Sequence, residues 1–179
     1  MSLHTYGIFL THHRYADQAA MDKHMASSAV AELLKIFGSD PKLFVEAPAI
    51  YGLPTKLSPS ASFTRRALAT LSDPYIIFAN FEYKAGTTGY AIQGWNDTVT
   101  HAEQSEKGTL SFTSIEDAEK GWVRTVEVYG DMDFLGPVMG KRKTIQEKRY
   151  QNGDLYTERK EVWELKMVAG YLYKEQNKL

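Results

Sequence analysis

The stretch YIIFANFEYK, residues 75–84, decides the fold. Its length and its content of β-branched and aromatic residues are typical of a buried strand. The triplet AGT, residues 85–87, predicts a turn, and Thr87 is a suitable cap for a helix that follows. Apolar residues then recur at spacings of three, four and three, on one helical face: Ile92, Trp95, Val99 and Ala102. A strand that leads into an amphipathic helix is the first half of a βαβ unit.

The residues after this helix complete the pattern. Lys107-Gly108 ends the helix, because glycine suits the conformation that closes a helix. The elements expected next are a strand, a charged turn, a strand, a helical region and a last strand, over residues 109–115, 116–121, 122–129, 131–150 and 160–173. The resulting order β-α-β-β-α-β is the ferredoxin-like split βαβ arrangement. We therefore predict an α+β fold.

The residues before position 75 repeat part of this order. A strand is expected at Tyr6–Thr11, a helix from the N-cap Asp17 to Phe37, and an extended segment at Leu43–Leu53. The chain therefore divides into a partial repeat over residues 1–53, a linker over 54–74 and a complete repeat over 75–174. The linker is rich in Ser, Thr, Pro and Ala, with a short helix expected around residues 63–71.

A single ferredoxin-like sheet carries helices on one face only, so its other face needs a cover. Two such sheets packed face to face close into a barrel whose interior suits a small apolar ligand. Two strands and a helix of the first repeat are absent from this chain. Either they were lost from its beginning or a neighbouring subunit supplies the cover, and we therefore expect a homodimer.

Composition removes several classes of function. The 179 residues contain no cysteine, which excludes disulfides, cysteine-ligated zinc, iron–sulfur clusters and a thiol nucleophile. A formal net charge of −1 argues against nucleic acid and membrane surfaces as partners. No secretory signal and no apolar run near the length of a membrane span is visible, so a cytoplasmic location is expected.

Four motifs in the complete repeat resemble the antibiotic-biosynthesis-monooxygenase family, and its fungal members in particular. They are FEYKAGT at residues 81–87, GW at 94–95, EKGTLS at 106–111 and RTVEVY at 124–129. In the first half, AAMDKHMASS at residues 19–28 is similar to the helix segment of that family that ends in His and Ser. The resemblance covers most of the chain and is weak over residues 54–74.

The resemblance implies a dimeric α+β barrel with an internal cavity, but it does not fix the chemistry. Some members are cofactor-independent oxygenases of polyphenolic polyketides, and others degrade haem. The haem-degrading members use an Asn, a Trp and a His at positions where this chain has Ala79, Met139 and Arg149. Haem degradation is therefore not expected, and we expect no cofactor.

Three functions remain open. The first is a cofactor-independent monooxygenase of an aromatic, polyketide-like small molecule in secondary metabolism. The second is a non-oxidative cyclase or isomerase on the same fold. The third is a non-catalytic barrel that binds a small molecule or a partner, so whether the protein is an enzyme stays undecided.

Two residues are candidate catalytic bases. His24 is the first, because histidine as a residue type suits proton transfer near neutral pH and because it matches the family's helix position. A structural hydrogen bond is the alternative role. Glu127 faces the barrel interior if Val126 and Val128 of the same strand pack beneath the helices. There it acts either as a base or as a strut paired with an arginine.

The candidate substrate-binding residues are one amide and four aromatic side chains: Asn80, Tyr83, Trp95, Tyr129 and Trp163. Core packing is the alternative role of the tryptophans. No metal site is expected, because no His, Asp or Glu cluster has a suitable spacing. Arg65-Arg66 and Lys141-Arg142-Lys143 are interpreted as solvent-facing basic side chains.

Overall fold

The computed structural model describes residues 17–39, 62–136, 138, 142 and 155–167. The chain forms two compact units, Met1–Thr55 and Lys56–Leu179. The strands predicted at residues 6–11 and 43–53 lie outside the described residues. No helix among those described is both long and apolar enough to cross a membrane.

The first unit contains two helices where the sequence predicted one. Helix α1 spans Gln18–Met25 and helix α2 spans Ser28–Ser39. Asp17 is the predicted N-cap, and its Oδ1 accepts a hydrogen bond from Ala20 N at 2.8 Å. Ser27 separates the two helices, because its Oγ accepts from Val30 N at 3.4 Å and starts α2.

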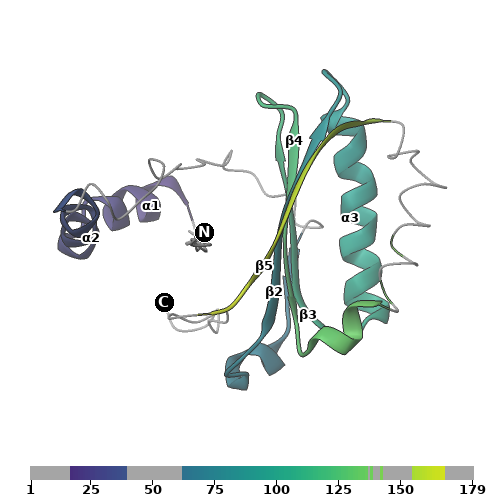
Figure 1. Ribbon diagram of the computed structural model, residues 1–179, viewed down its shortest axis with the longest axis horizontal. Helices are drawn as coiled ribbons and strands as arrows, with labels where there is room; N and C mark the ends of the chain where they lie inside the picture. The colour runs from purple at the N-terminus through teal and green to yellow at the C-terminus, as the bar shows by residue number, and fades with distance from the viewer. Residues whose placement is uncertain (1–16, 40–61, 137, 139–141, 143–154, 168–179) are drawn as a thin grey trace, which may run out of the picture. The chain divides into compact units, whose positions relative to one another are not determined.

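The second unit is a five-stranded antiparallel sheet of order β1-β3-β4-β2-β5, with helix α3 along one face (Figure 1). The strand bounds are Ser62–Thr64, Tyr75–Tyr83, Thr109–Asp117, Trp122–Tyr129 and Tyr156–Leu165 for β1 to β5. Helix α3 spans Thr88–Ser105, and the 3₁₀ turns η2 and η3 span Arg66–Thr70 and Met132–Phe134. Strands β5-β2-β4-β3 have the ferredoxin-like order, which confirms the predicted fold class.

Two glycines close turns that the sequence predicted. Gly86, between β2 and α3, has φ +77°, and Gly121, between β3 and β4, has φ +70°. Only glycine adopts this left-handed region without strain from a Cβ atom. After η3, residues 135, 136, 138 and 142 are helical, as expected for the second helix, and the rest of that predicted helix lies outside the described residues.

Pairing between β2 and β4 assigns each side chain to a face. Partners across an antiparallel pair share a face, and neighbours along a strand alternate. The proximal face, which packs against α3, carries the pairs Phe81–Val123, Ala79–Thr125 and Ile77–Glu127. The distal face, opposite α3, carries Ile76–Val128, Phe78–Val126 and Asn80–Arg124. The valines therefore lie away from α3 and Glu127 lies toward it, which is the reverse of the arrangement that would place Glu127 in the barrel.

Each face has its own apolar cluster. On the proximal face, α3 contributes Ala91, Trp95, Val99 and Ala102. The last three were predicted from the spacing, whereas the predicted Ile92 is only partly buried beside them and Ala91 takes its place in the core. The sheet contributes Phe63, Tyr83, Phe112 and Val123 to the same cluster. On the distal face, Leu68 of η2 packs with Ile76, Leu110 and Val128 and covers one end of the sheet.

Part of the predicted linker belongs to this sheet. Residues 62–64 form β1 on the outer edge of β3, and residues 66–70 form a 3₁₀ turn where a short helix was expected. Phe63 is buried beneath α3, which holds β1 in place.

Arg65 closes the end of α3 and is not the solvent-facing residue that the sequence indicated. Its Nη2 donates to the carbonyl oxygens of Glu103 at 2.6 Å and Ala102 at 3.2 Å. Its Nε donates to Thr109 O at 2.9 Å. A guanidinium at a helix C-terminus donates hydrogen bonds to carbonyl groups that have no intrahelical partner. Its positive charge also interacts favourably with the negative end of the helix dipole.

Arg65→Met should lower the free energy of unfolding by about 1–3 kcal/mol, because several backbone carbonyls lose a charged donor. Urea denaturation followed by tryptophan fluorescence measures this change. Lys160→Met is the control, because Lys160 is exposed, and it should stay within about 0.5 kcal/mol of wild type. Equal losses in the two variants would contradict the capping role of Arg65.

Candidate functional site

A buried group of charged side chains lies on the proximal face. Arg142 is 4% exposed and lies between two carboxylates. Its Nη1 donates to Glu127 Oε2 at 2.5 Å and its Nη2 donates to Glu106 Oε2 at 2.5 Å. Tyr129 donates its hydroxyl hydrogen to Glu127, and Thr109 Oγ1 donates to Glu106 Oε2 at 2.7 Å. We call these five residues the Arg142 cluster.

The protonation of the Arg142 cluster follows from its burial. Burial alone would lower the pKa of Arg142, but the carboxylates of Glu127 and Glu106 raise it above its ordinary value. Burial, and then the charge of Glu127, raise the pKa of Tyr129 above its ordinary value. Arg142 therefore stays charged and Tyr129 stays neutral, with its hydroxyl committed to Glu127.

Glu127 consequently has the geometry of a strut. It is 6% exposed and faces the helix layer, and its carboxylate receives hydrogen bonds from Arg142, Tyr129 and Thr125. Phe112 lies against the guanidinium, with Arg142 Cζ 4.6 Å from its ring centre. Through these hydrogen bonds, Arg142 links its own segment, which follows η3, to the sheet at Glu127 and to the C-terminal end of α3 at Glu106.

Tyr83 and Trp95, two of the predicted substrate-binding residues, lie in the proximal core. Trp95 Nε1 donates to the hydroxyl oxygen of Tyr83 at 2.8 Å, and both side chains are buried. Phe81 packs on Trp95 with ring centres 4.8 Å apart. This arrangement satisfies the polar atom of each ring inside an apolar layer, as packing residues require.

Asn80 and Trp163 both lie on the distal face. Phe78 pairs with Trp163 and Asn80 pairs with Glu161 between β2 and β5. The rings of Phe78 and Trp163 are 5.4 Å apart and inclined by 31°, and both are half-buried. Asn80 is 3% exposed, its Nδ2 donates to Glu161 Oε2 at 2.9 Å, and its Oδ1 has no hydrogen-bond partner among the described residues. An aromatic pair and an amide therefore lie next to each other on one surface.

His24 belongs to the other unit. It lies in the last turn of α1 and is half-buried. The seven predicted site residues therefore lie in four separate places: the first unit, the proximal core, the Arg142 cluster and the distal face.

The most informative side chains that the sequence analysis missed are Arg142 and Glu161. Arg142 was assigned to a solvent-facing basic stretch. The strut role considered for Glu127 required an arginine beside it, and that requirement was the available signal. Glu161 gave no signal, because a glutamate in an edge strand is ordinarily solvated.

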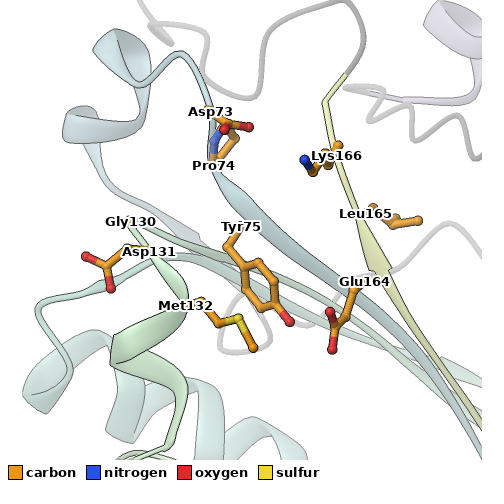
Figure 2. A pocket seen from close by; sticks show the side chains of 9 residues that line it. All are labelled: Asp73, Pro74, Tyr75, Gly130, Asp131, Met132, Glu164, Leu165 and Lys166. Atoms are coloured by element: carbon orange, nitrogen blue, oxygen red, sulfur yellow. The ribbon is translucent and has the colours of Figure 1, made fainter.

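A groove of about 410 Å³ lies at the end of the sheet where β2 begins and β4 and β5 end (Figure 2). Its lining residues are Asp73, Pro74, Tyr75, Gly130, Asp131, Met132, Glu164, Leu165 and Lys166. Burial, and then Glu164, raise the pKa of Tyr75 above its ordinary value. None of the predicted site residues lines this groove, so it does not coincide with the candidate site. Among the described side chains, no three His, Asp or Glu residues gather as a metal site would require.

Comparison with known proteins identifies the fold. No known family profile matches the chain, and no curated protein matches it. A provisionally assigned monooxygenase from Lactobacillus acidophilus superposes with a TM-score of 0.57 at 13% identity, over 85% of this chain and 67% of that one. The chain therefore has the ferredoxin-like α+β fold of that structure, and the resemblance predicted from the motifs is confirmed at the level of the fold.

Two further structures are similar to about half of this chain. A provisionally assigned antibiotic biosynthesis monooxygenase from Caulobacter crescentus has a TM-score of 0.45 at 14% identity, over 55% of this chain and 93% of its own. A protein from Mycobacterium tuberculosis has a TM-score of 0.46 at 19% identity, over 54% of this chain and 97% of its own.

Arg142→Met should lower the free energy of unfolding by about 3–5 kcal/mol, because it leaves Glu106 and Glu127 buried without a cation. The triple variant Arg142→Met, Glu106→Gln, Glu127→Gln should recover most of this loss. Urea denaturation measures both. The exposed Lys160→Met is the control. A loss for Arg142→Met no larger than that of Lys160→Met would exclude the strut.

Proposed function

We propose that this protein is a cofactor-independent monooxygenase of an aromatic, polyphenolic small molecule, acting as a cytoplasmic homodimer in fungal-type secondary metabolism. The observation that carries the proposal is the position of Asn80 on the distal face, two residues along β2 from Phe78 of the Phe78–Trp163 pair. A flat ring stacks on half-buried aromatic side chains, and an unpaired amide oxygen accepts a hydrogen bond from a phenolic hydroxyl. The family resemblance supports the reaction class.

The reaction needs a substrate that reduces oxygen by itself. In an anthrone-like substrate, loss of a proton gives a resonance-stabilised anion, which reduces O₂ directly. A ring CH₂ group and O₂ then give a C=O group and water, so one oxygen atom enters the product and the other leaves reduced. The protein supplies a surface that orients the ring and a group that accepts the proton. His24 is the base that the sequence indicates, and the oxygen-uptake experiment below tests it with the variant His24→Ala.

The homodimer covers the distal face in this proposal. Phe78, Val126 and Trp163 are half-buried apolar side chains of that face. A second copy packed against them completes the barrel and encloses a ligand between the two sheets.

A second candidate is a non-catalytic barrel that binds the same kind of ligand. The Arg142 cluster favours it, because Glu127 and Tyr129 are both committed to Arg142 and neither is available as a base. The two candidates share the distal face and differ in whether oxygen is consumed.

Oxygen uptake with a panel of anthrones and hydroquinones tests the first candidate. Wild type should consume one O₂ for each quinone formed, and Asn80→Leu, Trp163→Ala and His24→Ala should each lose about tenfold or more in rate. Gln93→Ala, at an exposed position of α3, is the control and should keep full activity. No oxygen uptake by wild type, with His24→Ala indistinguishable from it, would overturn the monooxygenase. A ligand-induced rise in melting temperature without product would then select the binding protein.

Light scattering after size-exclusion chromatography tests the homodimer. Wild type should elute as a dimer at micromolar concentration. Val126→Arg places a charge on the covered face and should give a monomer. Gln93→Arg adds the same charge on α3 and should remain a dimer. A wild-type monomer would contradict the shared barrel.

A further inference from the structure

Five polar side chains form a row across the distal face. Arg159 Nη2 lies 3.4 Å from Glu161 Oε1, and Glu161 Oε2 accepts from Asn80 Nδ2 at 2.9 Å. Asn80 pairs across the strands with Arg124, whose Nη1 donates to Asp117 Oδ2 at 2.7 Å. The charges along the row alternate and cancel, and the neutral amide of Asn80 lies at its centre.

Glu161 fixes the direction of the Asn80 amide. An ionised carboxylate only accepts hydrogen bonds, so it holds the NH₂ group of Asn80 and turns the carbonyl oxygen away. A flipped amide would bring two acceptor oxygens together. Asn80 Oδ1 is therefore left as the acceptor of the amide. It has no partner among the described residues, and the residue is 3% exposed. A buried acceptor without a donor is uncommon in folded proteins and indicates a missing partner.

The surroundings define the chemistry of that partner. The row carries no net charge, so it favours a neutral group over a carboxylate or an ammonium ion. Phe78 and Trp163 lie two residues from Asn80 and Glu161 along their strands, on the same face, which places an aromatic pair beside the acceptor. The Glu161 side chain is 30% exposed, so this side of the row reaches solvent.

We propose that Asn80 Oδ1, oriented by Glu161, is the specificity-determining group of a distal-face site that binds neutral aromatic molecules through a hydroxyl hydrogen. The site selects free phenols and hydroquinones and rejects their methyl ethers and quinones, which offer no hydrogen. This inference rests on the proposed function for the aromatic nature of the ligand.

Titration of the full-length chain under nitrogen with 2-naphthol and 2-methoxynaphthalene tests this selectivity. Tryptophan fluorescence reports binding, and circular dichroism confirms that each variant is folded. Wild type should bind 2-naphthol about tenfold more tightly than its methyl ether, which is the effect of one neutral hydrogen bond. Asn80→Leu removes the acceptor and should bind the two probes equally.

Glu161→Gln provides the second variant. Glutamine both donates and accepts, so the Asn80 amide is free to turn, and the preference should fall below about threefold. Glu164→Gln is the matched control, because Glu164 is an exposed glutamate of the same strand that pairs with Ile77 of the proximal face. It should keep the wild-type preference.

The outcomes separate this site from the proposed reaction. Equal wild-type affinities for the two probes, or a preference that survives in Asn80→Leu, would overturn the site. A wild-type protein that prefers 2-naphthol but consumes no oxygen in air would support the site and contradict the monooxygenase proposal. Oxygen uptake together with equal affinities for the two probes would support the monooxygenase proposal and contradict the site.

Discussion

The pairing of β2 with β4 is the constraint on which the second unit depends. The two central strands are joined over the pairs from Tyr75–Tyr129 to Glu82–Trp122, and this register assigns every side chain of both strands to one face. Glu127 thereby reaches Arg142 beneath the helix layer, and Asn80 reaches Glu161 on the opposite surface. A shift by one residue would exchange the two sets, placing Arg124 under α3 and Glu127 on the opposite face.

In the proposed function, the proximal face serves stability and the distal face serves recognition. On the proximal face every strong polar group of the Arg142 cluster has a partner, which is the condition for burying charges without a large loss of stability. On the distal face Asn80 keeps an acceptor without a partner beside half-buried aromatic rings. Unsatisfied groups of this kind are tolerated where a ligand completes them, and the proposed function follows from that difference between the faces.

Much of the fold could be predicted from local patterns, because strand length, turn glycines and helical spacing are properties of neighbouring residues. The strand at residues 122–129 and the helical face of Trp95 illustrate this. Which set of β4 side chains meets α3 could not be predicted, since both sets contain large apolar residues, and the partners that decide it, Glu106 and Arg142, are distant in sequence. The role of Arg65 was missed for the same reason, as its acceptors lie 37 and 38 residues away.

Thiol labelling tests the assignment of the faces most directly, because the chain has no cysteine and each introduced thiol is unique. Single cysteines at Phe78 and Val126, on the distal face, should react with a thiol reagent in the folded chain once the protein is diluted to monomers. Cysteines at Ala79 and Thr125, beneath α3 and 2% and 0% exposed, should react only at the rate of unfolding. Protection of the distal pair together with fast labelling of the proximal pair would contradict the register on which the site and the proposed function rest.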